Sequence, residues 1–407
     1  MFTHQDQLFL SAADSLLKLG GSAVRPNPKV GAVLVREAEI VAEGYHARYG
    51  GPHAEALALE RAGELARGST LYCTLEPCSF TAPDKHNEPC TAKIIRADVS
   101  RVVIGQLDPN SRVRGRGVEQ LRRAGIEVEI AADEELSRSL WYQNARFNTA
   151  HALKRPFVRL KLAQSLDGKI ATGQGDSKWI TDAQARSEVH HLRSDHDAVL
   201  VGAGTVHADD PLLNVRLARK DDAVNSKQPK AVVLDALART PLTSKLVQLR
   251  AEDLILCVAD ETALASLSYA ESAAFHKRVD KLTAAGVHIR RVPAANKRQL
   301  SLIHVLDELY QLKIQSVMVE GGAQVITSFI NAGLWDAMNL YIAPILIGGD
   351  GRGLGTLHTE RISEAVQLER VETRSIGPQA VISGFRSGWF ESVSRSVKEE
   401  LHVYGTR

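Results

Sequence analysis

Four side chains in the first quarter of the chain have the types and spacing of a metal site that activates water. His53 and Glu55 lie one residue apart in GGPHAEALAL, at the start of an apolar helical pattern, and two Pro-Cys pairs follow, ending at Cys78 and Cys90. A zinc ion that activates water takes three protein ligands and keeps one position open. A histidine nitrogen and two thiolates form such a set. The predicted ligands are therefore His53, Cys78 and Cys90.

Glu55 has a different expected role, because a carboxylate beside the metal can take a proton from water and deliver it to a leaving amine. Zinc lowers the pKa of its water to about 7, so hydroxide is available near neutral pH. The pattern matches the H-x-E…P-C signature of zinc-dependent nucleobase deaminases. Taken singly, His53 fits a helix cap and each cysteine fits a core; taken together they favour the metal site. Cys73 and Cys257 lie in apolar strand patterns and are predicted to be core residues.

Composition indicates an ordinary globular protein with small substrates. The chain has 407 residues, 44% of them hydrophobic and 24% charged, which suggests two domains. Lys and Arg number 50 and Asp and Glu 48, a balance that argues against a surface for long polyanions. The sequence shows no secretory signal and no apolar run long enough to span a bilayer. Four cysteines indicate a reducing compartment, and the expected location is cytoplasmic.

Strand-like and helix-like patterns alternate along the whole chain, which predicts an α/β protein. The first alternation runs from the helical pattern at 5–19 to the strand IEVEI at 126–130, and a polar helical stretch follows it. The second begins at FVRLKLAQSLDGKIA, after Arg155-Pro156. We therefore expect a first domain at 1–150 and a second, larger one at 151–407.

The first half resembles the deaminase half of the bifunctional riboflavin-biosynthesis deaminase/reductase family. The resemblance is carried by RPNPKVGAVLV, GYHARYGGPHAEALAL, TLEPCSF and LDPNSRVRGRGVEQLRRAGIEV. It implies a cytidine-deaminase-like three-layer domain that removes an amino group from a diaminopyrimidinone carrying a phosphoribosylamino arm. The resemblance also implies substrate contacts at Asn27, His46, Asp108 and Asn110.

One segment departs from the family pattern. The family usually has a histidine two residues after the first of the two cysteines and eight residues between them, whereas this chain has Phe80 and eleven residues between Cys78 and Cys90. A longer loop costs little free energy, so we expect the zinc site to be kept. The basic residue that contacts the substrate phosphate is either Lys85 or His86.

The second half contains a strand, a Gly-Gly turn and an amphipathic helix in SVMVEGGAQVITSFINAG. Such a turn presents backbone N–H groups to phosphate, although many α/β folds use it for steric reasons alone. RPFVRLKLAQSLDGKIA, SKWITDAQAR and AVLVGAGTVHADDPLLNVR resemble the reductase half of the same family, which has a dihydrofolate-reductase-like fold and uses NADPH. The cofactor contacts that the resemblance implies are Ala163, Trp179, Thr205, Asp209, Gly322, Ala323, Gln324 and Ser328.

The same resemblance implies a substrate site for the reduction. Its expected contacts are Ser177, Arg193, Leu213, Arg216 and Glu320. The two arginines suit a phosphate, because a guanidinium binds it bidentately. Hydride is expected to reach C1 of the ring-opened ribosyl group while an acid protonates nitrogen, and Lys161 and Glu320 are the candidate acid/base residues.

Three other sequence features are predicted to have no role in binding or catalysis. The arginine run at Arg112, Arg114, Arg116, Arg122 and Arg123 contains no interleaved aromatic residues and is read as a solvated loop and helix face. The histidines His190, His191 and His196 lack a ligand pattern and are read as surface residues. The polar segment from Glu391 onward is read as a loosely held tail.

The main hypothesis is therefore a bifunctional enzyme with zinc and NADPH that acts on a phosphorylated pyrimidine, without nucleic acid or membrane partners. The resemblance implies a homodimer formed through the reductase domain. One alternative is a transfer-RNA base deaminase with an unrelated second domain, which predicts salt-sensitive RNA binding. Another is an active reductase beside a non-catalytic deaminase-like module, which predicts zinc loss or zinc without turnover.

Overall fold

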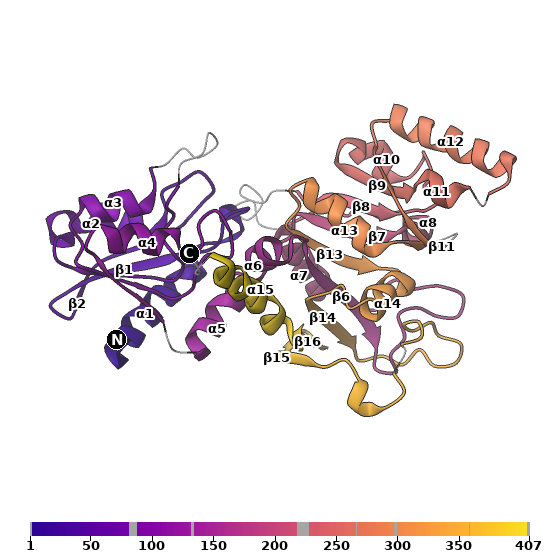
Figure 1. Cartoon of the computed structure of the whole chain (residues 1–407). Helices are drawn as coiled ribbons and strands as arrows, with labels where there is room; N and C mark the ends of the chain where they lie inside the picture. The colour runs from indigo at the N-terminus through magenta and orange to yellow at the C-terminus, as the bar shows by residue number, and fades with distance from the viewer. Residues whose placement is uncertain are drawn as a thin grey trace. The chain divides into compact units, whose positions relative to one another are not determined.

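The computed structural model describes residues 2–80, 88–131, 134–217, 228–265, 267–296, 299–357 and 359–404 (Figure 1). The chain forms two compact units. The first unit comprises Met1–Leu153 together with Phe390–Arg407, and the second comprises Lys154–Trp389. The C-terminal stretch thus groups with the first unit, whereas a simple division at residue 150 would have left it in the second.

The first unit is a five-stranded sheet between helices. Its strand order is β2-β1-β3-β4-β5; β1 pairs antiparallel with β2 and β3, and β3, β4 and β5 are mutually parallel. The strands are β1 (Gly31–Arg36), β2 (Glu39–Tyr45), β3 (Thr70–Cys73), β4 (Arg101–Ile104) and β5 (Glu127–Ile130). The helices are α1 (His4–Leu16), α2 (Ala54–Ala62), α3 (Cys90–Arg96), α4 (Arg116–Arg123), α5 (Glu134–Gln143) and α6 (Ala145–Leu153), with 3-10 turns at Leu17–Leu19, Ser22–Val24 and Gly63–Ala66.

Alternating side chains of β1 build the layers on both faces of this sheet. Ala32 and Leu34 pack with α2, α3 and α4, and Val33 and Val35 pack with α1. Figure 1 shows α2, α3 and α4 on one side of this sheet and α1 on the other. A strand buried on both faces needs apolar residues at every position, which is what GAVLV supplies. The expected three-layer α/β domain is confirmed.

Helix α2, which carries the candidate catalytic residues, lies directly against β2. A Cβ at Gly44 would lie 2.1 Å from the carbonyl oxygen of Ala54, so only glycine permits this contact. The helix start is therefore fixed by backbone packing as well as by side chains.

Asp6 anchors α1 to the sheet through a buried ion pair. Its carboxylate accepts hydrogen bonds from two guanidinium nitrogens of Arg101 (2.6 and 3.1 Å), from the Tyr72 hydroxyl (2.9 Å) and from Thr3. Burial favours the neutral acid, but these hydrogen bonds outweigh it and hold the pKa of Asp6 well below its ordinary value. The ion pair therefore stabilises the fold only while Asp6 is ionised.

We expect Asp6→Asn to lower the free energy of unfolding of the first unit by about 3 kcal/mol at neutral pH, because Arg101 loses its buried partner. Since the folded pKa lies below the unfolded value, this stability is present above about pH 4 and is lost as the pH falls through the folded pKa. Hydrogen exchange of first-unit amides at pH 7 and at decreasing pH measures it. The matched control is Glu127→Gln, because Glu127 contacts Arg101 from an exposed position and should contribute less than about 1 kcal/mol. Equal losses in the two variants would contradict the assignment.

The second unit is a nine-stranded sheet with the order β10-β9-β8-β7-β13-β6-β14-β16-β15. Neighbouring strands are parallel from β10 to β14, and the last two pairings are antiparallel. The strands are β6 (Phe157–Ser165), β7 (Ala198–Gly202), β8 (Lys230–Leu234), β9 (Leu254–Ala259), β10 (His288–Val292), β13 (Ser316–Gly321), β14 (Ala337–Ala343), β15 (Leu368–Ile376) and β16 (Gln379–Arg386).

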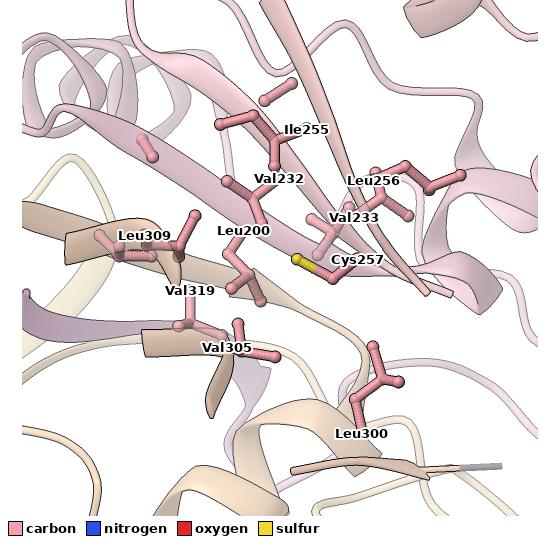
Figure 2. Packing of buried hydrophobic residues seen from close by; sticks show 14 of the residues in the cluster. Leu200, Val232, Val233, Ile255, Leu256, Cys257, Leu300, Val305, Leu309 and Val319 are labelled. Carbon is pink, nitrogen blue, oxygen red and sulfur yellow. The ribbon is translucent and has the colours of Figure 1, made fainter. Parts of the chain in front are cut away.

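Helices cover both faces of this sheet, which confirms the second α/β domain. The helices are α7 (Ala183–Ser194), α8 (Ala203–Asp209), α10 (Lys245–Arg250), α11 (Glu261–Leu264), α12 (Tyr269–Ala284), α13 (Leu302–Gln311), α14 (Ala323–Asn331) and α15 (Trp389–Tyr404). Helix α15 runs on into the first unit. The remaining elements are 3-10 turns at Ala251–Asp253 and Ile362–Glu364 and a small hairpin of β11 (Ala294–Asn296) and β12 (Gln299–Leu300). On β13, Val317 and Val319 face the larger core while Met318 packs with α7. Figure 2 shows Cys257 within the larger core beside Leu256 and Val233. The predicted core positions of Cys73 and Cys257 are confirmed.

None of the helices in the described ranges is both long enough and apolar enough to span a membrane.

Candidate active sites

The predicted metal ligands converge at one end of α2. His53 is the N-cap residue of α2, Cys78 follows β3, and Cys90 begins α3. The Nδ1 atom of His53 lies 3.6 Å from Sγ of Cys78 and 3.3 Å from Sγ of Cys90, and the three ligand atoms lie within 4.8 Å of one another. Tetrahedral zinc with ordinary Zn–N and Zn–S bonds needs N···S separations of roughly 3.5 Å. The donor set and its spacing therefore fit zinc.

Glu55 lies in the first turn of α2, beside this cluster. Its side chain is 3% exposed, and it shares a hydrogen bond with Cys90. Burial raises the pKa of the Glu55 carboxyl above its ordinary value, and nearby His53 opposes that rise. A shielded carboxylate of raised pKa is suited to holding and releasing a proton near neutral pH.

Asn27 and His46 form a hydrogen-bonded pair next to the cluster. The Nδ1 atom of His46 lies 2.9 Å from the carbonyl oxygen of Pro52, which can only accept, so Nδ1 carries the proton. Its Nε2 is then the acceptor for Nδ2 of Asn27, 3.2 Å away. The His46 and His53 rings meet edge to face at 5.3 Å. The amide of Asn27 is thereby oriented, and it has a second hydrogen to donate to a ligand.

Asp108 and Asn110 lie on a loop that a second buried carboxylate organises. The Oδ1 atom of Asp108 accepts from the backbone N–H of Asn110 at 2.7 Å. Glu76, two residues before Cys78, accepts the N–H groups of Asp108 (3.2 Å), Gly115 (3.0 Å) and Gly117 (3.0 Å). Burial raises the pKa of Asp108 to about 7, and the charges of Glu76 and Cys78 add to the rise. Glu76 thus ties the loop to the strand end that leads to Cys78.

The structure describes only part of the altered loop after Cys78. Phe80 is described, whereas Lys85 and His86, the alternatives for the phosphate contact, lie outside the described residues. The choice between them stays open.

The second unit contains a cavity of about 1700 Å³. It is lined by all of the residues expected to bind cofactor or substrate in the reduction: Lys161, Ala163, Ser177, Trp179, Arg193, Thr205, Asp209, Leu213, Arg216, Glu320, Gly322, Ala323, Gln324 and Ser328. These residues come from β6, β13, α7, α8, α14 and the loops between elements, so segments far apart in sequence meet at one cavity.

One end of the cavity is formed by the Gly-Gly turn between β13 and α14. Gly322 has φ 62° and is the N-cap residue of α14, a backbone conformation that favours glycine. A Cβ there would lie 3.5 Å from Oγ1 of Thr205 on α8. The free N–H groups at the start of α14 and the size of the cavity fit a dinucleotide with its phosphates.

Three charged side chains from β6, α7 and β13 form a mostly buried cluster on the same cavity. Arg193 donates from Nε and Nη2 to the two carboxylate oxygens of Glu320 at 2.5 and 2.6 Å, and from Nη1 to the carbonyl oxygen of Asn214. Although burial alone would raise the pKa of Glu320, Arg193 and then Lys161 lower it below its ordinary value. Burial lowers the pKa of Lys161, whose ammonium lies 5.3 Å from the Tyr341 ring centroid. Glu320 is therefore ionised, and Lys161 is the better proton donor.

Comparison with known proteins finds one family match in each half of the chain. Residues 3–106 match the model of the cytidine and deoxycytidylate deaminase zinc-binding region, and residues 156–382 match that of the RibD C-terminal domain. The riboflavin biosynthesis protein RibD of Aquifex aeolicus is 39% identical over 94% of this chain and 99% of its own length. The chain belongs to the RibD family.

Other RibD proteins are also similar to this chain over most of its length. The Escherichia coli protein is 37% identical over 93% of this chain and 98% of its own. A solved structure of Acinetobacter baumannii RibD is 34% identical, covers 94% of this chain and 99% of its own, and has a TM-score of 0.78. A Thermotoga maritima structure with the same identity and coverage has a TM-score of 0.72 and is described as a diaminohydroxyphosphoribosylaminopyrimidine deaminase/5-amino-6-(5-phosphoribosylamino)uracil reductase.

Some residues at or near the metal cluster and the cavity of this RibD-family chain were not predicted from the sequence. Glu76 was passed over, although a carboxylate at the end of an apolar strand signals a buried partner. His190 lines the cavity, where burial and the charges of Arg193 and Arg216 lower its pKa to about 4. His196 is 2% exposed. Reading His196 as a surface residue was wrong, because its ring is buried with Nδ1 against the carbonyl oxygen of Leu192. His190 is half-buried, and its Nδ1 lies 3.2 Å from the carbonyl oxygen of Asn214.

Proposed function

We propose that the first unit deaminates 2,5-diamino-6-(5-phosphoribosylamino)pyrimidin-4-one and that the second unit reduces the ribosyl group of the product to ribityl with NADPH. One observation carries this proposal. The chain holds a His-Cys-Cys cluster beside a buried glutamate and also a cavity lined by every residue expected for the reduction. Membership of the RibD family supports the pairing of these two activities in one enzyme.

In the deamination, His53, Cys78 and Cys90 would hold zinc. The ion supplies Lewis acidity, which in zinc enzymes makes water a nucleophile near neutral pH. Glu55 takes a proton and gives it to the amine nitrogen as that leaves, so that water is consumed and ammonia released. Asn27, oriented by His46, binds a polar edge of the pyrimidine ring, and the loop with Asp108 and Asn110 closes the opposite side of the substrate.

In the reduction, the turn at Gly322 and the start of α14 would hold the NADPH phosphates, with Thr205 beside them. The cofactor supplies the hydride. Lys161 gives a proton from Nζ to the substrate nitrogen as C1 of the ribosyl group is reduced. Arg193 is already engaged by Glu320 and fixes that carboxylate, so we assign the substrate phosphate to Arg216, which is exposed on the same cavity.

The proposal includes a cytoplasmic location and a homodimer formed through the second unit. The dimer is supported by two exposed apolar side chains. Val371 on the edge strand β15 is 52% exposed, and Ile362, shortly before that strand in sequence, is 91% exposed. Exposed apolar residues on a sheet edge are a natural place for a second copy to pair. A monomer in sedimentation velocity at micromolar concentration would contradict the dimer.

The deciding experiment offers the diaminopyrimidinone to the purified, zinc-replete chain. Without NADPH we expect release of one equivalent of ammonia. With NADPH added, we expect one equivalent to be oxidised per product. Treatment with a chelator should stop ammonia release but leave NADPH oxidation intact when the deaminated compound is supplied. Failure to release ammonia from this substrate would overturn the first half of the proposal, and failure to oxidise NADPH would overturn the second.

A further inference from the structure

The last described helix, α15, belongs to the first unit from Phe390 onward. The ring of Phe390 packs 6.2 Å from those of Trp141 and Tyr142, and the Arg138 guanidinium lies 4.4 Å over the Phe390 ring. Arg138 also contacts Glu391 at 3.2 Å. Reading this segment as a loose tail was wrong, because its described start packs firmly.

Apolar side chains spaced along the first half of α15 are buried. Trp389, Val393 and Val397 recur every fourth residue and are 0%, 0% and 2% exposed. The hydroxyl of Ser396 donates to the carbonyl oxygen of Ala152, at the end of α6, at 2.9 Å. The match to the RibD C-terminal domain ends at residue 382, so α15 lies beyond the part of the chain that this domain explains.

Arg114 links α15 to the loop of Asp108 and Asn110. Its guanidinium donates to the carbonyl oxygens of Asp108 (3.3 Å) and Val397 (3.3 Å) and to that of Pro109. The side chain is 8% exposed, whereas Arg112 and Arg116 of the same run are exposed. A buried guanidinium must have its N–H groups satisfied, and α15 supplies one of these acceptors. The reading of Arg114 as a solvated surface residue was therefore wrong.

The loop is thus held from two directions. Glu76 accepts its N–H groups on the side of the metal cluster, and Arg114 donates to its carbonyl groups on the side of α15. Both sets of bonds fix the backbone of the loop that carries Asp108 and Asn110.

We propose that Arg114 and α15 position the Asp108–Asn110 loop for substrate binding in the deamination. The inference rests on the proposed function of the first unit and adds Arg114 to it as a positioning residue. The end of the chain, which follows the reductase unit in sequence, then serves the deaminase site.

The test compares Arg114→Lys, a truncation after Trp389, and the control Arg116→Lys on the exposed side of the run. We expect the KM for the diaminopyrimidinone to rise about tenfold in the first two, with a smaller change in kcat, because each variant loses hydrogen bonds between Arg114 and backbone carbonyl groups. Zinc content and NADPH oxidation should stay within twofold of the parent chain. An unchanged KM in Arg114→Lys, or zinc loss that accounts for the whole effect, would overturn the inference.

Hydrogen exchange separates this inference from the proposed function. Amides of residues 108–117 should exchange faster in Arg114→Lys and in the truncated chain, and at the parent rate in Arg116→Lys. This result does not need an active deaminase. If the parent chain releases no ammonia, the proposed function fails while the exchange rates still decide whether α15 holds the loop. Unchanged exchange in both variants would sink the positioning role.

Discussion

The Glu55→Gln variant is expected to release ammonia about 10²–10⁴-fold more slowly than the parent chain, with little change in KM. Glutamine keeps the size and the burial of the side chain but cannot take up a proton from water. Zinc content should stay at one equivalent, because Glu55 is not one of the three clustered ligands. Ammonia release in a single turnover, measured beside metal content, separates loss of proton transfer from loss of metal.

The matched control for this variant is Glu60→Gln, an exposed glutamate on the same helix. It should deaminate at the parent rate. NADPH oxidation with the deaminated compound should be unaffected in both variants, since that chemistry belongs to the second unit. A Glu55→Gln enzyme with near-parent kcat would remove Glu55 from the mechanism and leave the proton carrier unassigned.

The Lys161→Met variant is expected to lower kcat for the reduction by about 10²-fold or more, while the Kd for NADPH stays within twofold. Methionine preserves the length and packing of the side chain against Tyr341 but has no proton to give. Because burial lowers the pKa of Lys161, its protonated form is lost as the pH rises, at a pH below the ordinary lysine value of about 10.4. The parent kcat should therefore fall on the alkaline side, and this limb should be absent from the variant.

Single-turnover NADPH oxidation across pH, together with NADPH binding by fluorescence, measures these effects. The control is Lys277→Met, because Lys277 is exposed on α12 of the same unit. A parent-like alkaline limb in Lys161→Met would assign that limb to another group, and an unchanged kcat would refute the acid role.

Much of the architecture could be predicted from the sequence because its signals are local. Fully apolar strands such as β1 and β9 are buried on both faces, and their alternation with helical patterns is enough to predict two α/β domains. The ligands of the metal cluster follow from spacing, since His53 begins a helix and Cys90 begins another.

What the sequence analysis missed depends on contacts between distant segments. The guanidinium of Arg114 meets the carbonyl oxygen of Val397, and no local pattern in a run of arginines marks the one that is buried. The polar composition after Glu391 concealed a signal that was present, because Trp389, Val393 and Val397 have the spacing of one helix face. The engagement of Arg193 by Glu320 likewise depends on α7 and β13 meeting in the folded unit.

The two-segment construction of the first unit has a consequence for synthesis on the ribosome. Met1–Leu153 emerges first, but Phe390–Arg407 emerges only after the whole of Lys154–Trp389 has been made. At about 5–20 residues per second the wait is roughly ten to fifty seconds. During that interval the surface that later receives Phe390, including Trp141 and Tyr142, lacks its cover. The first unit to be translated is therefore the last to be completed, and its nascent form presents an aromatic face on which chaperones can act.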